Sequence, residues 1–385
     1  MKFIIASSGK YHHFSLAKSL FKTNNLKKIF TGYPWFKVKK EKLPKEYVFC
    51  IGFFEIIIFI IKKISFNKAG FLYKKFIKLK KIVSDKIFLS RIKKIKNFDY
   101  FLCLSGDGLS SAKYIKSLNK TYICERSSSH ILYQEKILND EYKKLGFERK
   151  TNNWIIEREL KEYELADLIL VPSNFVKKTF EDYGLDNKVC VINFGANTDE
   201  FQKLNIKKND DDEFNILFVG QLSIRKGLHY LTKSFKDFDH SKKKLHIVGS
   251  RTPETNLIEK FLYKENTIFY GNRPKNEICQ IMNKVDVFVL PSLEEGMANV
   301  ILEATACGLP IILTENSGGA ELIEKLNNGF VVPIKNSQAI LEKLNLLKNK
   351  DILKKLSNNS KKFVNFYNWD RYSNELKKNL QLRNL

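Results

Sequence analysis

The stretch PSLEEGMANVILEATACGLP, from Pro291 to Pro310, follows the apolar run Val285–Leu290 and leads into a helical pattern. An apolar run, a turn and then a helical pattern are typical of one unit of a parallel α/β sheet. Glu295 stands in the turn, and Glu303 lies eight residues further on among apolar neighbours. Glu295 could be a first-turn acid stabilised by the helix dipole, and Glu303 an exposed helix residue. A tightly packed helix has little reason to keep an acid, however, so we predict that the two carboxylates hold different ends of one extended ligand, about 12 Å apart if the stretch is helical.

Units of the same kind recur along the chain. The strand-like runs fall into two series, which are separated by the charged segment Lys203–Glu213. Strands that alternate with helices indicate parallel sheets. Because Lys203–Glu213 lacks apolar periodicity, we expect it to link two domains. The first series comprises Lys2–Ala6, Asp99–Leu104, Thr121–Cys124, Asp167–Pro172 and Lys188–Asn193, and the second comprises Phe214–Val219, Lys244–Val248, Asn266–Tyr270, Val285–Leu290, Leu309–Leu313 and Gly329–Pro333.

The predicted fold is therefore α/β with two doubly wound domains. We expect a first domain at residues 1–205, a second at 206–365, and a final helix at 366–385 that could return to the first domain. In open doubly wound sheets, ligands bind at the carboxyl ends of the strands, where helix N-termini offer N–H groups and a positive dipole end. Residues directly after the strands are therefore the candidates for a site.

Composition points to a globular protein. The 385 residues are 43% hydrophobic and 28% charged, and no apolar run approaches the roughly 20 residues that a membrane span needs. The apolar stretch at the N-terminus is too short for a secretory signal, so the expected compartment is the cytoplasm. The six cysteines are scattered, which favours reduced thiols over a disulfide framework or a zinc site.

The formal net charge of +25 is concentrated in one segment. Between Lys62 and Lys96 there are 13 Lys or Arg residues and one acid, Asp85, so 12 of the excess positive charges lie there. The apolar run Ile51–Ile61 directly precedes them and suits either a core helix or an interfacial anchor. We therefore weigh docking of Ile51–Lys96 on an anionic membrane surface against a buried helix with solvated lysines that reflect genome composition. Nucleic acid is not the expected partner.

A second loop with candidate ligand contacts follows Phe214–Val219. It runs from Gly220 to Gly227, and Arg225 and Lys226 stand before the next helical pattern. Glycines allow a tight turn, and the two cations are well placed to neutralise a diphosphate. The loop is neither a P-loop nor a dinucleotide-binding fingerprint, and a surface Arg-Lys pair is usually only solvated.

The Glu295-x7-Glu303 spacing and its flanking sequence EGMANVILEATACGLP resemble the donor-binding signature of retaining glycosyltransferases of family 4. This family has the GT-B fold, in which two Rossmann-like doubly wound domains face a cleft. The similarity extends to the Gly220–Gly227 loop, to Asn316–Leu322 and to Asn328–Pro333. It is thinner in the first half, where it covers an opening strand with a Gly9 loop and the segments Val171–Phe175 and Asn193–Thr198.

The resemblance implies roles for individual residues. Glu303 would bind the ribose hydroxyls, Glu295 the hydroxyls of the donor sugar, and Lys226 the diphosphate, with help from backbone N–H groups. Many family members have Arg directly after the first glycine of the phosphate loop, where this chain has Gln221, so Arg225 is expected to supply the charge. The implied donor-binding set is Gly220, Arg225, Lys226, Glu295, Gly296, Met297, Ala298, Asn299, Val300 and Glu303, with Gly9 on a loop near the acceptor or the donor.

Three histidines are candidates for a position beside the donor sugar. The family has a His at about the place of His130, which follows a strand within CERSSSH, so His130 joins Glu295 and Lys226 as a candidate catalytic residue. The alternative is that His130 caps the following helix. His12 and His13, close to Gly9, are further candidates or exposed loop residues.

The implied function is transfer of a sugar, with retention of configuration, from a UDP- or GDP-sugar to a glycan or lipid-linked acceptor in bacterial polysaccharide or lipopolysaccharide synthesis. The departing phosphate oxygen can take the acceptor proton, and neither a metal nor another cofactor is required. Three alternatives remain open: a sugar-nucleotide epimerase of the same fold, a pyridoxal-phosphate phosphorylase, and a nucleic-acid-binding protein. The last explains the charge but not Glu295 and Glu303.

Overall fold

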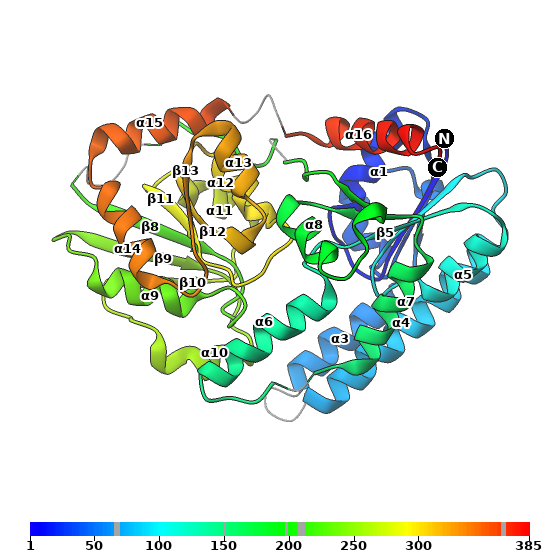
Figure 1. Ribbon diagram of the computed structural model, residues 1–385, viewed down its shortest axis with the longest axis horizontal. Coiled ribbons are helices and arrows are strands. Elements are labelled where there is room, and N and C mark those ends of the chain that lie inside the picture. The colour runs from blue at the N-terminus through cyan, green and yellow to red at the C-terminus, as the bar shows by residue number, and fades with distance from the viewer. Residues whose placement is uncertain (65–69, 150, 197–198, 207–211, 363–366) are drawn as a thin grey trace.

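A computed structural model of the chain contains two parallel sheets that lie side by side, each flanked by helices (Figure 1). The structure describes residues 1–64, 70–149, 151–196, 199–206, 212–362 and 367–385, with side chains left undescribed also at 59–64 and 70–74. The predicted α/β class with two doubly wound units is confirmed.

The first sheet has seven strands in the order β3-β2-β1-β4-β5-β6-β7, and every pair is parallel. Two of its strands were not expected from the sequence. β2 carries Lys27 and Lys28 inside its apolar run, and β3 is only three residues long. The strands are β1 (Phe3–Ser7), β2 (Leu26–Thr31), β3 (Val48–Cys50), β4 (Tyr100–Leu104), β5 (Thr121–Glu125), β6 (Leu168–Val171) and β7 (Val189–Val191).

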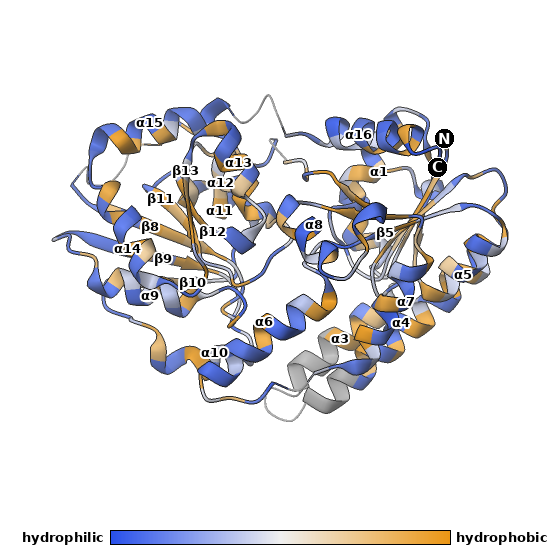
Figure 2. Ribbon diagram, in the orientation of Figure 1, coloured by the Kyte–Doolittle hydropathy of each residue, from blue (hydrophilic) through white to orange (hydrophobic). Residues whose placement is uncertain are grey.

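The second sheet has six parallel strands in the order β10-β9-β8-β11-β12-β13. All six residues of β8 are buried, because helices cover both faces of a parallel sheet and leave no solvated side. Figure 2 shows these strands as apolar and the helices around them as largely hydrophilic. The strands are β8 (Phe214–Val219), β9 (Lys243–Val248), β10 (Thr267–Gly271), β11 (Val287–Leu290), β12 (Ile311–Thr314) and β13 (Gly329–Val332).

Helices connect successive strands in both sheets. Those before β8 are α1 (His13–Lys22), α2 (Trp35–Val38), α3 (Phe53–Ile64), α4 (Gly70–Ile92), α5 (Leu109–Ser117), α6 (Ile131–Lys144), α7 (Asn153–Leu165) and α8 (Asn174–Glu181). Those after β8 are α9 (Leu228–Asp237), α10 (Thr255–Ile258), α11 (Lys275–Met282), α12 (Asn299–Ala306), α13 (Ala320–Leu326), α14 (Ser337–Leu346), α15 (Lys350–Ser360) and α16 (Trp369–Leu382).

The last helix, α16, lies beside α1, so the two ends of the chain meet on the first sheet's side of the molecule (Figure 1). Ser19 on α1 donates a hydrogen bond to the Asp370 carboxylate at 2.6 Å, and the hydroxyl groups of Ser19 and Ser373 are 2.7 Å apart. Between β7 and β8 the chain passes through the charged segment expected to link the domains, of which residues 207–211 lie outside the described part.

Helices α3 and α4 carry the apolar and basic segment. Phe54 and Ile58 are buried in the first domain, whereas Phe53, Ile56 and Ile57 are exposed. Two lysines of the basic segment point inward: Lys80 pairs with Glu55 at 2.5 Å, and Lys81 pairs with Asp107 at 2.5 Å. The segment is therefore partly core and partly exposed surface. None of the described helices is long and apolar enough to cross a membrane.

Candidate functional site

A cavity of about 1460 Å³ lies between the two sheets. Its walls come from loops at the carboxyl ends of strands in both domains, as the doubly wound architecture predicts. From the first domain they include the loops after β1, β4 and β5, and from the second the loops after β8 and β11. We call this cavity the cleft.

Most of the expected donor-binding residues border the cleft. They are Gly220, Arg225, Lys226, Glu295, Met297, Ala298, Asn299, Val300 and Glu303. The structure therefore brings together the loop after β8 and the loop before α12, which are about 70 residues apart in the sequence.

Two expected glycines lie behind the wall of the cleft rather than on it. A Cβ on Gly296 would lie 2.1 Å from the Ser127 carbonyl oxygen, and the Gly296 carbonyl accepts a hydrogen bond from Ser173 Oγ at 2.7 Å. Gly296 therefore permits close approach of the two domains. A Cβ on Gly9 would lie 2.5 Å from the ring of Tyr11, and the Gly9 carbonyl accepts a hydrogen bond from Thr31 at 3.1 Å. Gly9 thus shapes the loop that presents Tyr11 to the cleft.

Two cations converge on Glu295. Its Oε1 is 2.7 Å from Arg225 Nη1 and 2.7 Å from Lys226 Nζ. Burial lowers the pKa of Lys226 although Glu295 opposes this, while Glu295 and Glu294 raise the pKa of Arg225 against the effect of burial. A diphosphate could replace the carboxylate on both cations, because phosphate oxygens accept the same charge-assisted hydrogen bonds. This exchange would release Glu295 for other contacts.

Glu303 lies in the middle of α12, and its carboxylate borders the cleft. Burial raises its pKa to about 7, with Lys275 opposing the shift and Glu200 adding to it. The expected helical spacing between the two acids does not apply, because α12 begins only at Asn299 and Glu295 stands on the loop before it.

The structure places His130 away from the cleft. Its side chain is fully buried and does not border the cleft, and its Nδ1 accepts a hydrogen bond from the Leu132 N–H at the start of α6. Its ring stacks on Tyr183 with ring centroids 4.0 Å apart. Burial, with a contribution from Arg126, lowers its pKa to about 4. His130 therefore caps a helix and packs in the core.

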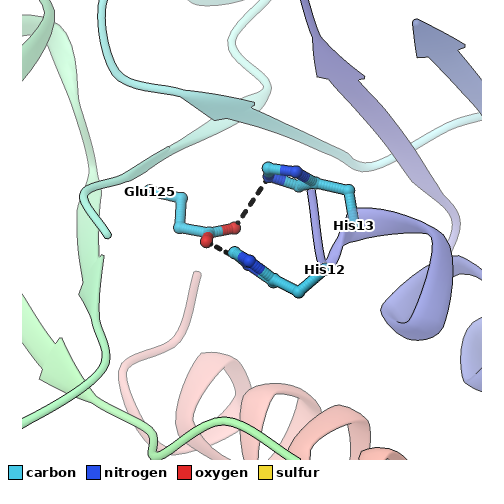
Figure 3. Close-up of side chains that lie close together, drawn as sticks. All are labelled: His12, His13 and Glu125. Carbon is cyan, nitrogen blue, oxygen red and sulfur yellow. Dashed lines mark ion pairs between the residues drawn. The ribbon is translucent and has the colours of Figure 1, made fainter. Parts of the chain in front are cut away.

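His12 and His13 instead meet on one buried carboxylate, that of Glu125 at the end of β5 (Figure 3). His12 Nε2 contacts one oxygen of Glu125, and His13 Nε2 lies 3.0 Å from the other. Within the described part of the chain, these three residues form the one cluster whose potential metal-ligating atoms all lie within 4.8 Å of one another. Both imidazoles contact the carboxylate directly, so ion-pair contacts link the three side chains.

Only His12 of this cluster borders the cleft. The Trp369 indole, at the start of α16, stacks on the His12 ring with centroids 5.6 Å apart and planes 8° apart. Sequence reasoning undervalued this histidine, although it follows β1 and Glu125 ends β5, and both strands neighbour β4 in the sheet. A comparison of the polar residues at the carboxyl ends of neighbouring strands would have singled out His12.

No pattern in the sequence pointed to Glu294, which joins the two domains. Its Oε1 accepts hydrogen bonds from the Ser129 N–H at 2.7 Å and from Ser128 Oγ at 2.8 Å. Its Oε2 accepts one from Gln134 Nε2 at 2.7 Å and lies 3.7 Å from Arg225 Nη1. Burial acts to raise the pKa of Glu294, but Arg225 and these hydrogen bonds outweigh burial. The net effect is a lowered pKa, so the carboxylate is ionised.

Comparisons with known proteins relate the chain to glycosyltransferases. Residues 197–363 match the model of the family described as Glycosyl transferases group 1. An uncharacterized glycosyltransferase, MJ1178 of Methanocaldococcus jannaschii, is 30% identical over 54% of this chain and 57% of its own length. CapM of Staphylococcus aureus, a capsular polysaccharide biosynthesis glycosyltransferase, is 29% identical over 52% of this chain and 57% of its own length. The chain thus spans little more than half the length of these relatives.

A longer but more distant match is the N,N'-diacetylbacillosaminyl-diphospho-undecaprenol alpha-1,3-N-acetylgalactosaminyltransferase of Campylobacter jejuni. It is 24% identical over 69% of this chain and 72% of its own length.

Solved structures share the fold over nearly the whole chain. HepE of Anabaena, in complex with UDP and glucose, has a TM-score of 0.70 with 16% identity over 99% of both chains. WaaG, a glycosyltransferase involved in lipopolysaccharide biosynthesis, has a TM-score of 0.67 with 14% identity over 97% of this chain and 98% of its own. The two-sheet architecture is therefore the GT-B fold.

Proposed function

We propose that the protein is a retaining glycosyltransferase of family 4 that transfers a sugar from a nucleotide-sugar to a glycan or lipid-linked acceptor. The observation that carries this proposal is the convergence of Arg225 and Lys226 on Glu295, with Glu303 on the same wall of the cleft. The match of residues 197–363 to glycosyltransferases supports it independently.

In the proposed complex, the diphosphate takes the place of Glu295 on Arg225 and Lys226. Glu295 is then free to accept hydrogen bonds from hydroxyls of the donor sugar, and Glu303 accepts them from the ribose. The N–H groups at the start of α12, near Asn299, add the positive end of a helix dipole.

The chemical step breaks the bond between the anomeric carbon and the diphosphate oxygen while the acceptor oxygen bonds to that carbon on the same face. Negative charge then grows on the leaving diphosphate. Arg225 and Lys226 are already held in place by buried contacts, so they stabilise this charge without costly reorganisation. We propose that these cations do the work that a metal ion does in other transferases.

For the acceptor, we propose a growing bacterial surface glycan. CapM is a capsular polysaccharide biosynthesis enzyme, WaaG acts in lipopolysaccharide biosynthesis, and the name of the Campylobacter relative specifies a diphospho-undecaprenol acceptor. A UDP- or GDP-sugar is the proposed donor, and HepE has been solved with UDP and glucose.

A lipid-linked acceptor would require the enzyme to work at a membrane surface. We propose that α3 and α4 provide the contact from the cytoplasmic side. Phe53, Ile56, Ile57 and Leu79 are exposed apolar residues on these helices. Lys75, Lys78 and Lys86 of α4 are exposed as well, so apolar insertion and attraction to anionic lipid reinforce one another.

A thermal-shift panel tests the donor assignment. We expect one UDP-, GDP- or ADP-sugar to raise the melting temperature of the wild type, because a ligand that binds the native state stabilises it. Lys226→Ala should abolish most of the shift, whereas the exposed control Lys233→Ala, on α9, should keep it. If no nucleotide-sugar stabilises the wild type, or if Lys226→Ala responds fully, the donor site is wrong.

A further inference from the structure

The cluster of His12, His13 and Glu125 belongs to the first domain and reaches the cleft through His12, whereas Arg225, Lys226 and Glu295 stand on loops of the second domain. Nothing in the proposed handling of the donor uses it. We propose that His12 is the base that removes the proton from the acceptor hydroxyl, and that Glu125 and His13 position it. This inference rests on the proposed function and names a proton acceptor other than the leaving phosphate.

The geometry gives His12 one nitrogen for Glu125 and one for a ligand. Its Nε2 contacts the Glu125 carboxylate, and among the described residues no hydrogen bond is made to its Nδ1. The ring is held between neighbours, since Trp369 stacks on it and the Phe194 ring centroid lies 4.2 Å from its own. A fixed imidazole with one nitrogen on a carboxylate is the arrangement that lets the other nitrogen act as a base.

The carboxylate is itself fixed. His13 is fully buried and contacts the second oxygen of Glu125, and Ser127 donates a hydrogen bond to the first oxygen at 3.1 Å. Glu125 therefore cannot swing away from His12 without leaving His13 unpaired. His13 and Glu125 do not border the cleft, which is why we call them positioning residues.

Protonation states favour a base. Burial lowers the pKa of His12, while Glu125 acts against that shift and His13 adds to it, so His12 is neutral near pH 7. The two imidazoles hold the pKa of Glu125 well below its usual range although burial opposes this, so Glu125 is ionised. Tyr372 of α16 also faces Glu125, and its raised pKa keeps it uncharged. An imidazolium formed on His12 would thus sit beside a carboxylate that stabilises it.

The acceptor O–H proton moves to Nδ1 of His12 while the acceptor oxygen bonds to the anomeric carbon. The bond from that carbon to the diphosphate oxygen breaks, and the nucleoside diphosphate leaves with the electron pair. The imidazolium then returns its proton to solvent through the open cleft.

His12→Gln tests the inference, because glutamine can still donate to Glu125 but cannot accept a proton. A positioned base contributes about 10²- to 10⁴-fold, so we expect kcat to fall at least 100-fold. The thermal shift with the nucleotide-sugar should stay as in the wild type. The acid limb of the wild-type pH profile of kcat, caused by protonation of His12, should disappear. His240→Gln, a histidine of the second domain outside the cleft, is the matched control and should keep wild-type values.

Glu125→Gln provides a second readout that does not depend on the folding of the first variant. Loss of the carboxylate should lower kcat and move the acid limb to lower pH, because Glu125 raises the pKa of His12. Wild-type kcat with an intact acid limb in His12→Gln would overturn the inference, as would an unmoved limb in Glu125→Gln. Absence of transfer by the wild type itself would instead overturn the proposed function, and this inference with it.

Discussion

Replacement of Glu303 by Gln should remove a pH dependence from donor binding. Burial raises the pKa of Glu303 to about 7, so the empty protein holds this group about nine-tenths protonated at pH 6 and about nine-tenths ionised at pH 8. Ribose hydroxyls donate hydrogen bonds, and the ionised carboxylate is the stronger acceptor. The wild type should therefore bind its nucleotide-sugar about tenfold more tightly at pH 8 than at pH 6.

Calorimetric titration over pH 6–8 measures this directly. A nucleotide-sugar is the right ligand, because it has no terminal phosphate that titrates in this range. Glu303→Gln should bind more weakly at pH 8 and with little change across the range, whereas Glu324→Gln, an exposed control on α13, should behave as the wild type. A flat profile for the wild type, or the same slope in Glu303→Gln, would refute the assignment of Glu303 to the ribose.

Stability without ligand gives an independent check with a definite sign. The folded pKa of Glu303 lies above the unfolded value of 4.5, so the unfolded chain releases this proton first as the pH rises. Unfolding free energy should therefore fall between about pH 4.5 and pH 7 by roughly 1.4 kcal/mol per unit, or about 3 kcal/mol in all. Glu303→Gln should lack this loss and be the more stable protein above pH 7.

Three further outcomes follow from the structure. Lys226→Ala should lower activity about tenfold or more, and by more than Arg225→Ala, because charge-assisted hydrogen bonds to phosphate are worth roughly 1.5–3 kcal/mol; the opposite ranking in steady-state assays would mean that the phosphate loop is misaligned by one residue. His130→Ala should cost roughly 2–3 kcal/mol of stability in denaturant titrations, from the lost helix cap and ring contacts, and should leave the kcat of the remaining folded protein near wild type. Co-sedimentation should show binding to anionic but not neutral vesicles. Gln at three exposed lysines of α4 should weaken this binding roughly 100-fold, since each lysine is worth about 1 kcal/mol near such a surface, whereas Gln at three exposed lysines of α15 should leave it unchanged. Binding that does not depend on lipid charge would mean that the basic segment is only a solvated face. The α4 set is Lys75, Lys78 and Lys86, and the α15 set is Lys350, Lys354 and Lys355.

Hydrophobic patterning was enough to predict most of the fold. β8 has the bounds expected from the apolar run Phe214–Val219, and β13 ends one residue earlier than expected. Such runs stand out because strands covered on both faces are apolar throughout. β2 escaped detection because Lys27 and Lys28 interrupt its apolar run, and β3 because three residues are too few to form a pattern.

The cleft wall that we propose binds the donor was predictable for a different reason. Its residues come from two continuous loops, and each loop carries its own recognisable spacing. Glu125, His12 and Glu294 act through partners far away in the sequence, such as Ser129, which is 165 residues from Glu294. The His12–Glu125 contact depends on the order of strands in the first sheet, and the Glu294 contacts depend on how the two sheets are placed, so no local pattern encodes either. The position of His130 could not be predicted either, since a histidine that caps α6 and one that borders the cleft look alike in the sequence.

We propose above all that the cleft transfers a sugar, with retention of configuration, from a nucleotide-sugar to an acceptor. The most direct measurement incubates the protein with the stabilising nucleotide-sugar, labelled in its sugar, with and without lipid extract from glycan-producing bacterial membranes, followed by product analysis and NMR of the anomeric centre. We expect release of nucleoside diphosphate and a labelled glycolipid, formed only when the extract is present and with the anomeric configuration of the donor. Conversion of the donor to an isomer in the absence of any acceptor, or a labelled product with inverted configuration, would contradict it.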